Sequence, residues 1–162
     1  MTIKILRIDD RLIHGQIVTQ WIRESGAKGI LVADDKAAKD ATQQMMLKIA
    51  TPQGIKLFIE PLAQVPQFLQ EHTGDLLVLV RNPKSARTLV EAGLEIPTIN
   101  VGNISNSKSA VGRKTLLAYI HVEPSDVEDL RFLAQSGVKL DVRAIPTDRS
   151  IDGTDLLNKS FA

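Results

Sequence analysis

The run LLVLV, residues 76–80, is the most apolar stretch of the chain. A strand that is apolar on both faces is typical of a parallel sheet with helices on each side, so we predict a buried central strand here. On either side of this run, short apolar stretches alternate with helical patterns along the chain. This alternation predicts an α/β fold: a single domain over residues 1–162, with a mostly parallel central sheet and helices on both faces.

The same patterns give the other expected elements. Further strands are expected at residues 3–8, 29–33, 55–59, 98–101, 116–122 and 139–145. Helices are expected at residues 16–24, 37–49, 62–71, 83–93, 124–135 and 151–159. Helical periodicity places Trp21 in the core, and we also assign Met45 and Met46 to the core. A polar loop is expected from residue 102 to residue 114.

Composition excludes several classes of protein and of site. The 20 Lys and Arg residues nearly balance the 19 Asp and Glu residues, and a net charge of +1 argues against a dedicated nucleic-acid binder. The absence of cysteine excludes disulfides, thiolate metal sites and cysteine catalysis. Charges between Lys4 and Arg11 are incompatible with a signal peptide, and no run approaches the roughly 20 apolar residues of a membrane span. We therefore expect a soluble, cytoplasmic chain that associates with a membrane only through partner subunits.

The segment DDRLIHGQ, residues 9–16, joins the first expected strand to the first expected helix. Ligands of parallel α/β sheets bind beyond the carboxyl ends of the strands, which is where this loop lies. Apolar periodicity begins at Ile17, so the helix should start at or just after His14, with its first N–H groups directed at an anion such as phosphate. Gly15 permits close approach of a ligand, because it has no Cβ.

Two side chains of this loop have the chemistry of a phosphate site. His14 can act as base, acid or nucleophile, and Arg11 can make a bidentate contact with phosphate. The chain has no GxGxxG, GxxxxGK[ST] or GxSxG motif, which disfavours a Rossmann dehydrogenase, a P-loop enzyme and an α/β hydrolase. This elimination favours a covalent site on His14. The alternative stays open that His14 is an idle loop residue and that the aspartates complete a turn.

Other polar groups have simpler structural explanations. Asp34 and Asp35 follow the second expected strand and are expected to cap the next helix, and no His or Glu accompanies them at metal-ligand spacing. His72 lies at an expected helix end and His121 in an apolar strand, where we expect structural roles. The segment GNISNSKS, residues 102–109, is rich in hydrogen-bond donors for an anion, but such residues are also common in exposed loops.

RIDDRLIHGQIVTQW, residues 7–21, resembles the active-site signature of the IIB subunits of the mannose/fructose/sorbose family of the bacterial phosphoenolpyruvate-dependent sugar phosphotransferase system. Four further stretches are similar to family positions: ILVADDKAAKD (30–40), ATPQGIKL (50–57), PTINVGN (97–103) and GVKLDVRAIPTD (137–148). The likeness therefore covers essentially the whole chain. One departure is Gly102-Asn103, where the family pattern has Gly-Gly after the Asn-Val pair.

The resemblance implies a phosphocarrier enzyme, a protein-Nπ-phosphohistidine–sugar phosphotransferase. In the family, the residue matching His14 accepts a phosphoryl group, by resemblance on Nδ1, from a phosphohistidine of a IIA protein or domain. It then passes the group to a sugar held by the membrane subunits IIC and IID. No cofactor and no metal are implied, and a homodimer is compatible with the family. The site residues taken together are His14, Arg11 and Asp10 for catalysis, and Arg11, Gly15, Gln16 and Ile17 for phosphate binding.

Within this interpretation, Asp10 is expected to pair with Arg11 or to orient the imidazole, because a carboxylate touching the phosphate would repel it. Two successive partners must reach His14, so a partly apolar surface is expected around it, formed by Leu12 and Ile13. Two alternatives from other classes remain: a non-catalytic module that binds phosphate or a sugar phosphate through this loop, and a regulatory interaction protein with the same fold. Mannose, fructose, sorbose, glucose and amino sugars all remain candidate substrates.

Overall fold

The computed structural model describes residues 2–105 and 112–161. Its strands are β1 (Thr2–Asp9), β2 (Gly29–Ala33), β3 (Lys56–Glu60), β4 (Asp75–Val80), β5 (Thr98–Asn103), β6 (Lys114–Leu117), β7 (Ile120–Val122), β8 (Lys139–Val142) and β9 (Ile151–Asp152). Its α-helices are α1 (Gly15–Ser25), α2 (Asp35–Lys39), α3 (Ala41–Ala50), α4 (Val65–Glu71), α5 (Pro83–Glu91), α6 (Pro124–Gln135) and α7 (Gly153–Ser160). A 3₁₀ turn, η1 (Leu62–Gln64), precedes α4.

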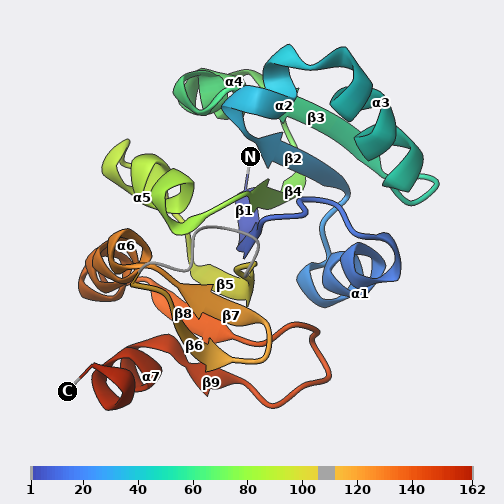
Figure 1. The fold of residues 1–162 in the computed structure, drawn as a ribbon. Coiled ribbons are helices and arrows are strands. Elements are labelled where there is room, and N and C mark those ends of the chain that lie inside the picture. Colours follow the sequence, from blue (N-terminus) through green and yellow to red (C-terminus); the bar gives the residue numbers. More distant parts are fainter. Residues whose placement is uncertain (1, 106–111, 162) are drawn as a thin grey trace.

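Within the described residues, seven strands form one sheet in the order β3-β2-β4-β1-β5-β8-β9 (Figure 1). Neighbouring strands are parallel except for β9, which runs antiparallel to β8. Strands β6 and β7 form a separate antiparallel hairpin. The run at residues 76–80 belongs to β4, which lies inside the sheet between β2 and β1. The predicted α/β domain with a mostly parallel sheet is therefore confirmed.

Helices cover both faces of the sheet, and each face has its own apolar cluster (Figure 1). Helices α1, α2 and α3 pack on one face, against side chains that include Leu77 of β4. Helices α4, α5, α6 and α7 pack on the other face, against side chains that include Val78 of β4. Because successive side chains of a strand point to opposite faces, a strand covered on both sides must be apolar throughout, as β4 is.

Two expected elements are each divided in two. The helix expected over residues 37–49 is α2 followed by α3, because the Asp40 carboxylate accepts hydrogen bonds from the amides of Thr42 and Gln43 and starts a new helix there. The strand expected over residues 116–122 is the β6–β7 hairpin. Its turn at residues 118–119 lacks the Gly or Asn that usually marks a two-residue hairpin loop, so the sequence pattern does not show it.

Two other expectations are also wrong. The strand expected over residues 139–145 ends at Val142, and the chain returns to the sheet as β9. Met45 and Met46 were assigned to the core, but each is 65% exposed, and the buried residue of α3 is Leu47. The helix has one inward-facing side, and neighbouring positions along the sequence cannot all occupy it. None of the described helices is long and apolar enough to cross a membrane.

The end of β1 is a point of divergence in the sheet. After β1 the chain passes to α1 on one face, whereas after the adjacent strands β4 and β5 it passes to α5 and to the β6–β7 hairpin and α6 on the other face (Figure 1). Open α/β sheets place their ligands in the crevice that such diverging connections leave. The topology therefore directs attention to the loop between β1 and α1.

Candidate functional site

The loop between β1 and α1, residues 10–14, is a compact turn anchored in the core. The Leu12 amide donates a 2.9 Å hydrogen bond to the Asp9 carbonyl, and Leu12 has a φ of 60°. A left-handed backbone is unfavourable for a leucine and is characteristic of functional loops. Leu12 and Ile13 are only 2% and 7% exposed and pack under α1, so the expectation that they form an exposed apolar surface is wrong. Their burial holds the loop against the sheet.

The first helix begins where the sequence predicts. His14 is the N-cap residue of α1, and Gly15, with a φ of 40°, is its first residue. The amides of Ile17 and Val18 donate to the His14 carbonyl at 3.0 and 3.3 Å. In the described part of the chain, the amides of Gly15 and Gln16 have no hydrogen-bond acceptor. Two N–H groups at the positive end of the helix dipole are thus free to bind an anion, whereas the Ile17 amide is already engaged.

The imidazole of His14 is exposed to solvent at this helix start. It does not cap the helix, and no described residue forms a hydrogen bond or ion pair with it. Both ring nitrogens are therefore accessible to a group brought by another molecule. Gln16, the second residue of α1, is also exposed.

Arg11 is paired with Asp9, and not with Asp10 as expected. Its Nε and Nη2 donate to the two carboxylate oxygens of Asp9, each at 3.1 Å, and its backbone amide donates to Oδ1 at 2.9 Å. Asp9 is 1% exposed, whereas the Arg11 side chain is 37% exposed. Bidentate pairing orients the guanidinium plane and leaves its Nη1 edge without an acceptor among the described residues.

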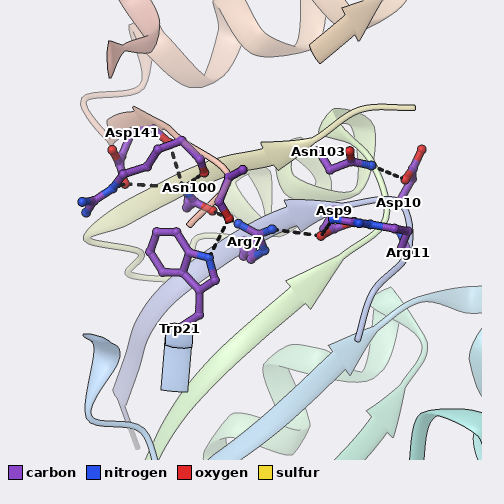
Figure 2. A network of polar contacts seen from close by, with 10 residues as sticks. Arg7, Asp9, Asp10, Arg11, Trp21, Asn100, Asn103 and Asp141 are labelled. Carbon is purple, nitrogen blue, oxygen red and sulfur yellow. Dashed lines mark hydrogen bonds and ion pairs between the residues drawn. The ribbon is translucent and has the colours of Figure 1, made fainter. Parts of the chain in front are cut away.

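Asp10 anchors the loop to the ends of the adjacent strands instead. Its carboxylate accepts hydrogen bonds from Asn103 Nδ2 at 2.6 Å and from the Ser105 amide at 2.7 Å, both at the end of β5. Its carbonyl accepts from Arg81 Nη1, beyond β4, at 3.4 Å. Figure 2 shows the Asp10 carboxylate pointing away from Arg11, toward Asn103. The departure from Gly-Gly at Asn103 therefore supplies a contact to this loop.

Asp34 caps α2, as predicted, by accepting a 2.9 Å hydrogen bond from the Ala37 amide. Arg81 also donates to it, from Nε at 3.2 Å and from Nη2 at 2.9 Å. Burial raises the pKa of Asp34, but the hydrogen bonds from Arg81 and Ala37 and the charge of Arg81 outweigh burial and hold the pKa below its usual range. Arg81 thus ties the ends of β2, β4 and the site loop together. The sequence analysis missed this role, although Arg81 directly follows the apolar run of β4.

The other two histidines are engaged in local structure. His72 donates from Nδ1 to the Phe68 carbonyl at 3.0 Å and stacks on the Phe68 ring with 4.0 Å between centroids. His121 contacts the Thr115 hydroxyl through Nδ1 at 2.8 Å and the Ala118 carbonyl through Nε2 at 3.1 Å. Both arrangements agree with the structural roles expected for these residues.

Two further points complete the description of the candidate sites. Of the donor-rich segment 102–109, residues 106–109 lie outside the described part of the chain. Among residues 2–105 and 112–161, no group of three or more His, Asp or Glu side chains is placed to hold a metal ion.

An open groove of about 710 Å³ runs along α1, between this helix and the loop that follows β8. Polar side chains of α1 form one wall and the β8–β9 loop forms the other; the lining residues are Gln16, Thr19, Gln20, Arg23, Glu24, Pro146 and Thr147. Of the candidate site residues, Gln16 lines this groove.

Comparisons with known proteins agree with one another. The profile of the family "PTS system sorbose subfamily IIB component" matches residues 3–162. The chain is 32% identical to the sorbose-specific EIIB component of Klebsiella pneumoniae, over 99% of this chain and 98% of that protein. It is 31% identical to the mannose-specific EIIAB component of Escherichia coli K12, over 98% of this chain but only 49% of that protein. The crystal structure of the IIBSor domain of the Klebsiella sorbose permease superposes with a TM-score of 0.91, at 32% identity and over 100% of both chains.

Proposed function

The chain belongs to the sorbose subfamily of IIB components of the sugar phosphotransferase system, and from this membership we propose that His14 is its phosphoryl acceptor. The observation that carries the proposal is the exposed imidazole of His14 at the start of α1. The unpaired amides of Gly15 and Gln16 directly follow it at the helix start, and the oriented guanidinium of Arg11 belongs to the same loop. Histidine supplies the nucleophile, and the amides and guanidinium supply charge for phosphoryl oxygens.

The proposed reaction has two transfers. In the first, the P–N bond to a histidine of a IIA donor breaks and a P–N bond to the His14 imidazole forms. In the second, this P–N bond breaks and a sugar hydroxyl oxygen takes the phosphoryl group; the proton that the hydroxyl loses is balanced by the one that the freed imidazole takes up. The loose transition state of phosphoryl transfer places charge on three equatorial oxygens, so positioning and positive charge supply most of the catalysis. Arg11 and the Gly15 and Gln16 amides have the chemistry for this.

Asp10 receives a supporting role in this proposal. Both of its carboxylate oxygens accept hydrogen bonds from the end of β5, so it acts on the position of the loop and not on the phosphoryl group. This also removes a difficulty, since a carboxylate facing the phosphate would repel it. Gln16 remains a candidate phosphate ligand through both its amide and its exposed side chain.

The partners follow from the two transfers. The donor is a IIA protein or domain. The mannose-specific relative is named an EIIAB component, and this chain matches 49% of it, which supports an association with IIA. The acceptor is a sugar held by membrane subunits IIC and IID, so we place the chain at the cytoplasmic side of the membrane through these subunits. Relatives of nearly equal identity are named for sorbose, mannose and N-acetylgalactosamine, so the substrate is proposed only as a hexose or an amino sugar.

Labelling with phosphoenolpyruvate, the general phosphotransferase proteins and a IIA protein tests the acceptor. The wild-type chain and the His72→Ala and His121→Ala variants should each take up one phosphoryl group, in a linkage stable to alkali and labile to acid. The His14→Ala variant should take up none while keeping its fold by circular dichroism. Labelling of folded His14→Ala would refute the assignment. Absence of labelling in the wild type would favour a non-catalytic phosphate-binding module.

A further inference from the structure

A row of buried polar side chains crosses the sheet beneath the site loop (Figure 2). Arg7 on β1, Asn100 on β5 and Asp141 on β8 are direct partners in the parallel register, so their side chains lie side by side on the α1 face. They are 1%, 0% and 3% exposed. Burying a guanidinium costs free energy unless it is paired, and the arrangement of this row shows how the cost is met.

Arg7 holds two different partners with the two ends of its fork. Its Nη1 donates to Asn100 Oδ1 at 2.6 Å, and its Nη2 donates to Asp9 Oδ2 at 3.0 Å. Asp9 is the same residue that receives Arg11 in a bidentate pair. Asp9 therefore stands between two guanidinium groups, one buried and the other partly exposed at the surface of the site loop.

The position of Arg7 is fixed by its surroundings as well as by its hydrogen bonds. A Cβ on Gly102 would lie 2.0 Å from Arg7 Nη1, so the guanidinium occupies the space that any other residue at 102 would fill. On the other side, the Trp21 ring lies 5.3 Å from the guanidinium carbon. Trp21 is itself held by a 3.1 Å hydrogen bond from its Nε1 to the Ala144 carbonyl. The buried end of the row has little freedom to move.

The charges in this row bear on the phosphoryl group. Asp9 alone would neutralise Arg11 and leave the site without net attraction for an anion. With Arg7 present, two guanidinium groups face one carboxylate, and the Arg7–Asp9–Arg11 set carries a net positive charge. Burial lowers the pKa of Arg7 and the charge of Asp9 opposes that change, so the pairing also keeps Arg7 charged.

We propose that Arg7 is a positioning residue for phosphoryl transfer. Through Asp9 it orients the guanidinium of Arg11, and its charge offsets that of Asp9, so that Arg11 still attracts the phosphoryl oxygens. The inference rests on the proposed function of His14 and extends it to a residue that touches neither the phosphoryl group nor a partner. Arg7 fixes Asp9, Asp9 fixes the plane of Arg11, and the Nη1 edge of Arg11 remains for the phosphate.

The first experiment measures transfer from phosphorylated IIA to the Arg7→Met and Arg7→Lys variants, per folded molecule. Arg7→Met should lower kcat about 10-fold or more and change KM for the donor less than about 2-fold, because Arg7 is too deeply buried to touch the donor. Arg7→Lys keeps the charge without the fork and should recover part of the rate. Arg87→Met is the charge-matched control: Arg87 pairs with Asp129 and lies over Phe132 between α5 and α6, and its loss should leave kcat unchanged.

A second variant keeps the proposal falsifiable if Arg7→Met fails to fold. Asp9→Asn preserves the shape of the linking residue and should lower kcat by a similar factor. In the double variant Arg7→Lys, Asp9→Asn, the loss should be no larger than that of Asp9→Asn alone, because one residue acts through the other. Independent, multiplicative losses would overturn the proposed link.

Binding of inorganic phosphate gives a readout that a purely structural role would not move. In the wild type, titration with phosphate should shift the NMR signals of the Gly15 and Gln16 amides. In folded Arg7→Met the apparent affinity should fall, because the net positive charge of the Arg7–Asp9–Arg11 set is lost, and in Arg87→Met it should not. A wild-type rate and wild-type phosphate affinity in folded Arg7 variants would overturn the inference while leaving His14 as acceptor. An unlabelled wild type, or labelling of folded His14→Ala, would instead count against the proposed function itself.

Discussion

At the residue scale, two nitrogens of the Arg11 guanidinium bind Asp9, and the third, which has no acceptor among the described residues, is the one proposed to bind phosphate. A lysine would keep the charge but could not serve both sides with one planar group. We expect Arg11→Lys to slow phosphoryl transfer about 10-fold or more with little loss of stability. Rapid-quench assays of phosphoryl transfer from phosphorylated IIA measure this rate, with Arg131→Lys on α6 as the control. A loss within about 2-fold, ~0.4 kcal/mol, would show that Arg11 serves only as a partner for Asp9.

Asp34 should make stability depend on pH in the acid range. Its pKa lies below the usual value in the folded chain, so the ionised form stabilises the fold. This contribution is complete above the unfolded pKa of about 4 and is lost as pH falls through the lower folded pKa. Asp34→Asn should therefore cost about 2 kcal/mol at pH 7, from the weakened cap and the lost ion pair with Arg81, and less at pH 3.

Urea denaturation at the two pH values measures this difference. Asp35→Asn is the matched control, because the neighbouring carboxylate is exposed and its contact is a single hydrogen bond from the Leu62 amide. An Asp34→Asn effect that stays constant between pH 3 and pH 7 would contradict the assigned role of the ionised carboxylate.

The two adjacent aspartates show how far the sequence could be taken at this scale. The motif located Arg11 and His14, but it assigned the pairing with Arg11 to Asp10, and the structure gives that role to Asp9. Strand alternation places Asp9 on the same face as Arg7, two residues earlier, and directs Asp10 elsewhere. What alternation does not provide is the identity of the neighbouring strand ends, and these decide that Asp10 meets Asn103.

At the scale of elements, the start of α1 has a natural control at its other end. Gly15 and Gly26 both have positive φ, 40° and 71°, and an added Cβ at either would meet no atom within 4 Å. Alanine at either position should therefore cost a similar backbone strain of about 1–2 kcal/mol. Only Gly15→Ala should also slow phosphorylation per folded molecule, because it lies where the free amides meet the anion.

Thermal melting and labelling rate on the same preparations separate strain from phosphate binding. If Gly15→Ala loses stability as Gly26→Ala does but is phosphorylated at the wild-type rate, Gly15 serves only the turn into the helix. If Gly15→Val, with its larger side chain, is also phosphorylated at the wild-type rate, the amides at the helix start do not bind the phosphoryl group.

Elements with a strong period or a known cap were predictable, and those set by tertiary contacts were not. The start of α1 follows from apolar periodicity at Ile17, and β4 follows from its continuous apolar run. The break between α2 and α3 depends on the Asp40 cap, which a long helical pattern conceals. The β6–β7 hairpin turns without Gly or Asn, and its position depends on the bridge between Ile104 and Ile120.

Over the whole molecule, the α1 face of the sheet changes character at β1. It is apolar over β2, β4 and Ile5 of β1. It becomes polar at the row formed by Arg7, Asn100 and Asp141, where Trp21 of α1 meets the loop after β8. Single polar residues in three separate strands gave no signal of this row in the sequence, because only the strand order brings them together. The site loop lies at the boundary, supported by apolar packing on one side and by the polar row on the other.

The open setting of His14 also predicts how the phosphoryl group leaves. The groove along α1 is walled by this helix and the β8–β9 loop and is open to solvent. Transfer to a hydroxyl requires the acceptor to be held in line and shielded from water, which an additional surface must supply. We therefore expect the phosphorylated chain alone to form no sugar phosphate from sorbose, mannose or fructose, and to form it when membranes containing the matching IIC and IID subunits are added.

Radiolabelled chain, free sugars and such membranes provide the measurement, with His14→Ala in the same membranes as the control. The rate of label loss without membranes should be the same with and without sugar, since a mobile sugar at an open site gains little effective concentration. Sugar phosphate formed by the chain alone, at a rate comparable to that with membranes, would mean that the groove along α1 is itself a sugar site. In that case the groove residues Gln16 and Thr19 would become the first positions to substitute.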